Sequence, residues 1–471
     1  MSAPVRPRTG PRLDRPHPAL TGRPLAPQQR GLWFLQQLRP STSEYNVQIA
    51  LRMRGPLRLA ALQNTLNLLV LRHEPLRTTI RADASGQPRQ YVWPSRHISL
   101  DPEPVRASAD ELDAHVRRIV RQEVREPFDL AAGWPMRVRL VRLGDEDHLL
   151  VLTFNHLAVD GVSLSILSDE LSAVYAALVA GEPVRLPDLD LTFAEHAAWL
   201  AGRSVDGAGL EYWRGELDGV GDLELPADRA GHGVGASMIT VRREVSEPTV
   251  RGLTALARSA GSSLFAACLT GYGLLLHRCT GQRDFAVGMP VAARTEAACE
   301  RIVGCFMNTV CVRFRINPEL PIRGLVQQTG RAVAGALEHQ TVPFGEVVRA
   351  VRPGRSTARH PLFSAFCSAV DGAPPAFPLA GLTTEVVVAD YPVARFDLNA
   401  TFALGLRHAA IQLECSDALF EPATARQLAD RLVSVLDWTA ADGDRPVASV
   451  PALGRAERAH VLSLLNGRHD G

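Results

Sequence analysis

The sequence predicts an α/β or α+β protein with mixed sheets flanked by helices, built as two lobes. Its 471 residues exceed the size that one hydrophobic core usually serves. Strand-like and helix-like hydrophobic patterns interleave along the chain. A region over 182–210, rich in Pro and Gly with little periodicity, separates two stretches of similar element order. We therefore expect a disordered tail at 1–20, an N-terminal lobe at 21–205 and a C-terminal lobe at 206–471.

The first lobe opens with helical signals and then forms a hairpin. Apolar residues recur at helical spacing over 58–72, and Ser108 with Glu111 forms a capping box that starts a second helix. Residues 136–140 alternate with period two, and a polar turn then leads into Leu149–Phe154. This second strand is apolar on both faces, which predicts a central place in its sheet.

The second half repeats the theme after the linker. Residues 238–245 are typical of a strand, and 248–258 and 262–279 are typical of helices. Short strands are predicted at 285–288 and 310–314. The similar order of elements suggests a duplication, although no fixed-period repeat is present.

Composition excludes several function classes. The formal net charge is +1, so no basic field favours nucleic acid, and all 51 basic residues are arginine, so no lysine can form a Schiff base. The seven cysteines contain no CxxC pair, which favours a reduced, cytoplasmic protein and disfavours zinc. The first 20 residues lack a signal peptide's apolar segment, and no apolar run is long enough to predict a membrane span.

The motif Asn155–Gly161, which reads NHLAVDG, carries the chemistry. A buried strand delivers His156 to a turn just before a helix-patterned run over 164–178. An imidazole there can take a proton from an attacking amine or hydroxyl, or hold that group in place. Asp160 can hold the turn, and Gly161 can adopt positive φ or let a substrate approach the bare backbone. Ser163 is a candidate cap for the following helix, whose amides could stabilise an oxyanion.

The same residues allow three other interpretations. A lone histidine in a strand is most often a buried residue satisfied by its neighbours. A serine-hydrolase triad is disfavoured because the chain has no GxSxG, so the attacking group should come from a substrate. A metal site on His156 and Asp160 lacks a third ligand.

The chain resembles the condensation domain of nonribosomal peptide synthetases, in the chloramphenicol-acetyltransferase-like superfamily. The likeness is collinear from about Leu25 to about Leu462. Each matching segment is modest alone, but they occur in the family order. The segments are Pro24–Leu35, Arg72–Thr78, Asn155–Gly161, Leu191–Trp199, Val303–Thr309, His339–Phe344 and Arg355–Phe363.

The resemblance implies two acetyltransferase-like lobes in a V-shaped pseudo-dimer with a central tunnel. It implies that the second histidine of the family motif HHxxxDG, here His156, is catalytic, with Asp160 and Gly161 in the same site. Asp160 is expected to pair with an arginine of the second lobe, here Arg294. Asn155 and Ser163 are expected to shape the site. Phe306, Asn308 and Thr309 are candidates for lining the tunnel.

One departure from the family motif is Asn155, which stands where the first histidine is expected. That position is mostly architectural in the family, and an amide can replace one imidazole hydrogen bond. We expect activity to survive. The cyclising variant is excluded by His156. A non-catalytic recruitment domain and a coenzyme A-dependent O-acyltransferase remain as alternatives.

The resemblance also implies the partners. The expected reaction moves an acyl or aminoacyl group from a carrier-protein phosphopantetheine thioester to an amine or hydroxyl, forming an amide or ester. No bound cofactor or metal is expected. Peptidyl or acyl carrier proteins are the expected partners, with a small soluble acceptor as an alternative, and neither nucleic acid nor membrane. The chain is expected to be either free-standing or the start of a larger synthetase.

Other segments of the resemblance are interpreted as structural. Gln29, Trp33 and Phe34 are expected to pack a helix. Arg72, His73 and Arg77 are expected to fix a helix end and the start of a strand. His339 and His360 are expected to make structural hydrogen bonds.

Overall fold

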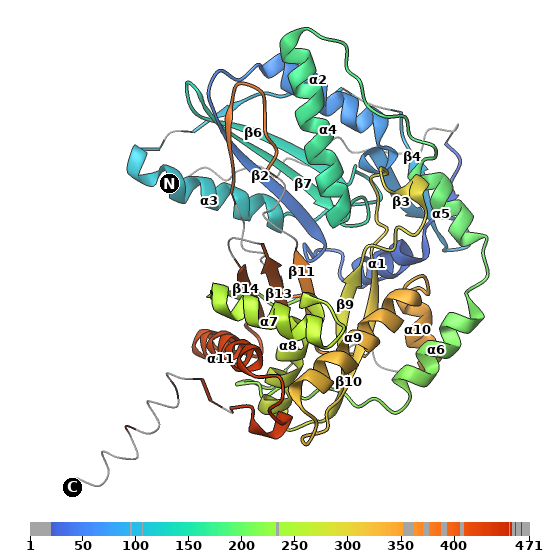
Figure 1. Ribbon diagram of the computed structural model, residues 1–471. Helices are drawn as coiled ribbons and strands as arrows, with labels where there is room; N and C mark the ends of the chain where they lie inside the picture. The colour runs from blue at the N-terminus through green and yellow to red at the C-terminus, as the bar shows by residue number, and fades with distance from the viewer. Residues whose placement is uncertain are drawn as a thin grey trace. The chain divides into compact units, whose positions relative to one another are not determined.

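In the computed structural model the chain forms two compact units (Figure 1). Unit 1 comprises 1–204, 292–307 and 374–392, and unit 2 comprises 205–291, 308–373 and 393–471. The structure describes residues 20–94, 97–105, 107–231, 235–351, 362–370, 376–387, 393–405, 409–451, 453–454, 457 and 463. The predicted tail at 1–20 lies outside the described residues, apart from Leu20.

Unit 1 is organised around a five-stranded sheet in the order β12-β2-β7-β6-β5, with a second sheet in the order β1-β4-β3. Strand β7 is central and buried along nearly its whole length, as its two apolar faces predicted. The strands of unit 1 are β1 (Arg23–Pro24), β2 (Asn46–Arg54), β3 (Thr78–Ala82), β4 (Pro88–Val92), β5 (Glu103–Pro104), β6 (Met136–Gly144), β7 (Asp147–Asn155) and β12 (Thr383–Val386).

Helices α2 and α4 pack on each other over this sheet, and α3 packs on β2 and β7. The Ser108–Glu111 capping box predicted for the start of α3 is present. The helices of unit 1 are α1 (Pro27–Leu38), α2 (Leu59–Arg72), α3 (Ala109–Arg125), α4 (Gly161–Ala180) and α5 (Phe193–Ala201), with short 3₁₀ turns η1 (Glu74–Arg77) and η2 (Ala297–Cys299).

Unit 2 contains a six-stranded mixed sheet in the order β10-β9-β11-β13-β14-β8. Its strands are β8 (Met238–Val245), β9 (Asp284–Val291), β10 (Asn308–Arg315), β11 (Ala365–Val370), β13 (Leu398–Leu404) and β14 (Ala409–Ser416). Helices α8, α9 and α11 pack against it. The helices are α6 (Gly207–Leu217), α7 (Glu247–Ser259), α8 (Leu264–Thr280), α9 (Ile322–Glu338), α10 (Phe344–Val351) and α11 (Pro422–Ala441), with the 3₁₀ turn η3 (Val447–Ser449).

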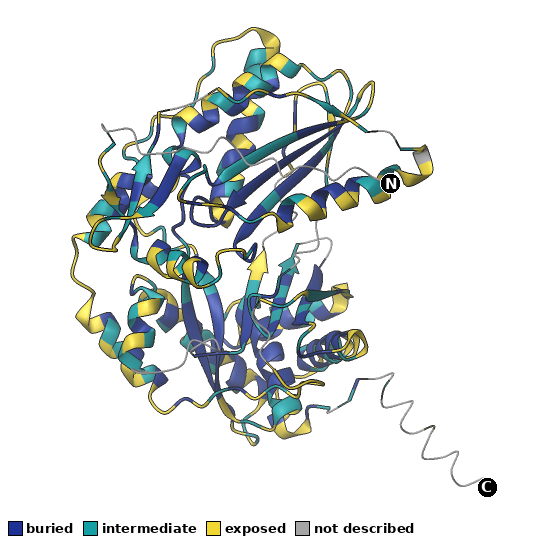
Figure 2. Cartoon of the chain, turned by 180° about the vertical axis from the view of Figure 1, so that it is seen from behind, coloured by how far each residue is buried: buried dark blue, intermediate teal, exposed yellow. Residues whose placement is uncertain are grey.

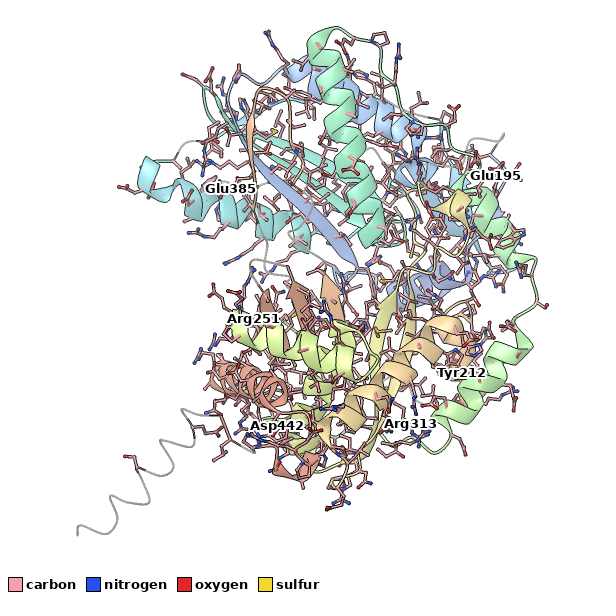
Figure 3. The ribbon with its side chains drawn as sticks, in the orientation of Figure 1. Glu195, Tyr212, Arg251, Arg313, Glu385 and Asp442 are labelled. Carbon is pink, nitrogen blue, oxygen red and sulfur yellow. The ribbon has the colours of Figure 1, made fainter. Side chains whose placement is uncertain are left out.

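The division of the chain is less simple than a single break at residue 205. Residues 292–307 and 374–392 belong to unit 1, although both lie in the second half of the sequence. The second segment adds β12, which carries Glu385 (Figure 3), to the edge of β2. In the strand register Glu385 stands opposite Arg52. Arg294, expected from the second lobe, is therefore a unit 1 residue. The V shape and the central tunnel stay predictions.

Helix α4 is the most apolar long helix of unit 1. It contains an 18-residue window of mean hydropathy 1.5, so by length and composition alone it could cross a membrane, as could the bent pair α7 and α8. Its buried face, including Leu167, Leu171 and Tyr175, packs into the unit 1 core, and a core helix passes the same test. In Figure 2 the central strands are mostly buried, and exposed residues mark the outer sides of the helices.

The seven cysteines all carry free thiols, and six of them are buried. Burial raises the pKa of Cys268 to about 12, which makes that thiol a poor nucleophile at neutral pH.

Candidate active site

The motif lies at a strand-to-helix turn, as predicted. Strand β7 ends at Asn155 and α4 begins at Gly161, so His156 occupies the turn between them. The backbone N–H of His156 donates to the Tyr45 carbonyl at 2.7 Å, which extends the β2–β7 ladder by one bond. The histidine is 7% exposed. Its backbone position is therefore fixed by the sheet.

Asn155 shapes this turn with its side chain. Its Oδ1 accepts the Leu157 N–H at 3.0 Å, an Asx turn, and its Nδ2 donates to Gln36 Oε1 at 3.3 Å. Gln29 donates to the Leu157 carbonyl at 2.8 Å. Helix α1 thus supports the histidine turn through two glutamines. Gln29 is more than a packing residue, and the role of Gln36 was missed because its contact spans 119 residues of sequence.

Asp160 is the N-cap of α4, and its carboxylate is 2% exposed. Oδ1 accepts the backbone N–H and the hydroxyl of Ser163 at 2.8 and 2.7 Å. Oδ2 accepts the Phe306 N–H at 3.1 Å. The positive end of the helix dipole also favours a negative charge here.

Arg294 neutralises this buried carboxylate. Its Nη2 donates to Asp160 Oδ1 at 2.9 Å and to Oδ2 at 3.2 Å. Its Nη1 donates to the carbonyls of Cys299 and Ile302 at 2.6 and 2.7 Å. The guanidinium, 5% exposed, also lies 3.9 Å from the centre of the Phe306 ring. The structure therefore brings the predicted partners Asp160 and Arg294 together.

Ser163 does not cap α4, contrary to the sequence prediction. Asp160 occupies the N-cap, and Ser163 lies three residues into the first turn, where its N–H needs a capping acceptor. The Ser163 hydroxyl bridges instead to Gly304, whose N–H donates to it at 3.0 Å and whose carbonyl lies 2.9 Å away. Ser163 thereby fastens the 292–307 segment to α4.

Gly161 is the first residue of α4 and is exposed. Its φ is not positive, so the interpretation based on left-handed backbone was wrong. A Cβ added at this position would meet nothing within 4 Å. The space beside this backbone is open, which agrees with the alternative interpretation that another molecule approaches it closely.

Phe306 belongs to an aromatic cluster behind the ion pair. Its ring packs against Phe193 in an edge-on arrangement at 5.2 Å and against His196 at 4.9 Å. His196 Nδ1 lies 3.4 Å from Cys299 Sγ. Burial and, next, the Arg294 charge lower the pKa of His196, so the neutral imidazole is favoured there. His196 lies in one of the segments that resemble the family. The sequence around it did not predict its contacts with Phe306 and Cys299, because these residues are more than 100 positions away.

Asn308 and Thr309 belong to unit 2, at the start of β10. Asn308 donates to the carbonyls of Gln340 and Val342 at 2.8 and 2.7 Å and accepts the Phe344 N–H. It therefore holds the turn before α10. Thr309 stands opposite Pro290 in the β9–β10 ladder. Their role in lining a tunnel stays a prediction.

Structural roles are confirmed for the arginines near α2. Arg77 Nε donates to the Val70 carbonyl at 3.0 Å, closing the end of α2. Arg72 and His73 both bind Glu170, at 3.1 and 2.7 Å. The carbonyl of His339 accepts the Trp213 indole N–H, and the His339 ring stacks on that of Tyr212. His360 and most of Arg355–Phe363 lie outside the described residues.

The helices and mixed sheets described above place the chain in the acetyltransferase-like α/β fold class. Within that class, the condensation domain model matches residues 21–462, and the chain belongs to the condensation domain family of nonribosomal peptide synthetases. Among the described residues no group of three or more His, Cys, Asp or Glu side chains could hold a metal ion.

Curated relatives are much longer than this chain. Phosphinothricin tripeptide synthetase PhsC of Streptomyces viridochromogenes is 35% identical over 95% of this chain and 42% of its own length. Malpinin synthetase of Mortierella alpina is 31% identical over 94% of this chain and 6% of its own length. The chain thus spans less than half of each.

Solved structures share the fold. The X-domain from teicoplanin biosynthesis is 26% identical, with a TM-score of 0.82 over 94% of this chain and 99% of its own. The first condensation domain of the calcium-dependent antibiotic synthetase, in complex with a substrate analogue, is 22% identical, with a TM-score of 0.75 over 92% of this chain and 100% of its own. The second likeness supports the fold alone.

Proposed function

We propose that this chain catalyses condensation, transferring an acyl or aminoacyl group from a carrier-protein phosphopantetheine thioester to an amine or hydroxyl acceptor. The observation that carries the proposal is His156, held in the turn between β7 and Gly161, whose own backbone is exposed and sterically open. Membership in the condensation family supports a general peptide-bond-forming role.

The proposed step moves one acyl group and one proton. The acceptor nitrogen attacks the thioester carbonyl carbon, so that a C–N bond forms as the C–S bond breaks. His156 orients the acceptor or takes its proton, and that proton reaches the departing sulfur. Asp160 and Arg294 are positioning residues, because their contacts fix the turn that carries His156.

The test is a condensation assay on the whole chain. A donor-loaded carrier protein and an acceptor are incubated with the enzyme, and product is quantified by mass spectrometry. We expect His156→Ala to lose about 10²-fold or more in rate. His148→Ala is the control, because His148 is a buried histidine at the far end of the same strand. Product from His156→Ala at the wild-type rate would refute the catalytic assignment.

The same assay distinguishes a carrier-protein donor from a coenzyme A donor. Presenting the acyl group on coenzyme A instead of a carrier protein should give slower transfer. Equal or faster transfer from coenzyme A would favour an O-acyltransferase. Asn155→His should change the rate little, because an imidazole nitrogen can accept the Leu157 N–H that Asn155 Oδ1 accepts now.

A non-catalytic recruitment role is the second candidate. A solved complex of the X-domain and OxyB from teicoplanin biosynthesis, 26% identical to this chain, supports it. In that case wild-type and His156→Ala would both give no product, while both would bind a carrier protein or tailoring enzyme equally in a pull-down assay. A bound partner without turnover would establish this role.

A further inference from the structure

The two faces of the unit 2 sheet differ sharply in chemistry. On one face, alternate residues of β13 and β14 such as Ala400, Ile411 and Leu413 are fully buried, and α8 and α11 pack there (Figure 1). On the opposite face the same strands carry polar side chains. The strand register places these polar side chains in two rows, each of which runs across β11, β13, β14 and β8. The rows are Phe366, Asn399, Glu414 and Thr240, and then Ser368, Thr401, Gln412 and Arg242.

Glu414 lies at the centre of this polar face with both carboxylate oxygens fixed. Asn399 Nδ2 donates to Glu414 Oε2 at 2.6 Å, and Gln412 Nε2 donates to Oε1 at 2.8 Å. A carboxylate only accepts hydrogen bonds, so it turns both amide nitrogens towards itself and leaves the amide oxygens as acceptors. Two of its roughly four lone-pair positions also remain. Most of the hydrogen-bonding positions that Glu414, Asn399 and Gln412 leave unused are therefore acceptors.

Two neutral acceptors beside the carboxylate strengthen this bias. Asn399 Oδ1 and Thr240 Oγ1 are buried, and no hydrogen-bond donor in the described part of the chain reaches either atom. Both residues stand opposite Glu414, one on each neighbouring strand. Buried polar atoms are usually satisfied. The Asn399 amide oxygen only accepts and the Thr240 hydroxyl can accept as well as donate, so both atoms can take an N–H group of a ligand.

An aromatic wall borders the row at β11. Phe366, which stands opposite Asn399, stacks on Phe396 at 4.1 Å and 6°. Phe363 packs against both rings, at 5.9 and 5.7 Å. Gly288 makes the room, because a Cβ there would lie 2.3 Å from the Phe363 ring. Aromatic side chains supply a large apolar contact area, so the wall can hold the apolar body of a ligand whose charge the carboxylate binds.

We propose that this face of unit 2 binds a cationic nitrogen group, an ammonium, amidinium or guanidinium attached to an apolar body. Glu414 pairs with the charge, Asn399 and Thr240 accept the remaining N–H groups, and Phe366 with Phe396 contacts the apolar body. Arg242 lies on the same face opposite Gln412 and carries the competing charge. Among the described residues, Glu414 forms no ion pair with Arg242.

The experiment measures binding and does not depend on the condensation activity. Benzamidine is titrated against the whole chain by ligand-observed NMR, with benzamide as the neutral, equally shaped probe. We expect saturable binding of benzamidine and none of benzamide. Glu414→Gln should weaken benzamidine binding by at least about tenfold, as loss of a charge-assisted hydrogen bond predicts.

The matched control is Glu244→Gln, which removes an exposed carboxylate from the same face, opposite Ala410. It should leave binding unchanged. Thr240→Val should weaken binding severalfold without changing charge, and Arg242→Gln should strengthen it. Equal binding of both probes, or the same loss in Glu414→Gln and Glu244→Gln, would overturn the proposal. A thermal melt confirms that each variant is folded.

Discussion

Removing Arg294 tests the buried ion pair that holds the histidine turn. The Arg294→Gln variant leaves the Asp160 carboxylate, 2% exposed, without its counter-charge, and it also removes donors to the Cys299 and Ile302 carbonyls. Breaking one side of a buried pair costs about 3–5 kcal/mol. The bonds that Ser163 and Phe306 donate to Asp160 remain, so we expect the lower part of this range.

Equilibrium urea unfolding of the whole chain, followed by circular dichroism, measures this cost. The control is Glu247→Gln, which breaks an exposed i,i+4 pair with Arg251 and should cost under about 0.5 kcal/mol. The double variant Asp160→Asn/Arg294→Gln removes both charges and should be at least about 1 kcal/mol more stable than the sum of the single changes predicts. An Arg294→Gln cost no larger than that of the control would refute the reasoning.

Three further predictions concern the surroundings of this pair. Gly304→Ala places a Cβ 2.1 Å from the Phe193 ring and should cost about 1–3 kcal/mol in urea unfolding. Gly161→Ala meets open space and should stabilise the fold by ~0.4–1 kcal/mol while slowing condensation; an unchanged rate would contradict close approach at that backbone. Burial and Arg294 hold the pKa of His196 below its usual 6.5, so the unfolded chain binds that proton more readily and the free energy of unfolding should fall as pH drops below 6.5. His196→Gln should flatten this dependence, and an unchanged slope would contradict it.

Local patterns predicted much of the fold because they act over short sequence distances. The helix predicted over 58–72 is α2, Leu59–Arg72, and the strand predicted over 238–245 is β8. The central place of β7 followed from its two apolar faces. Strand β12 was not predicted, because its four residues gain strand structure only by pairing with β2, more than 300 residues away.

The site shows the same limit. The position of His156 between a strand and a helix could be predicted from the apolar run and the glycine. The partnership of Asp160 with Arg294 came from the resemblance, since 134 residues separate them. The glutamines of α1 and the bridge from Ser163 to Gly304 depend on tertiary contacts. No periodicity in the sequence encodes such contacts.

The segments 292–307 and 374–392 determine when unit 1 can complete its folding during translation. When residue 205 leaves the exit tunnel, the carboxylate of Asp160 still lacks its guanidinium, and the outer edge of β2 has no neighbouring strand. The guanidinium arrives with residue 294 and the edge strand only with 383–386. The part of unit 1 before residue 205 must therefore wait, incompletely folded, until the ribosome has added residue 386.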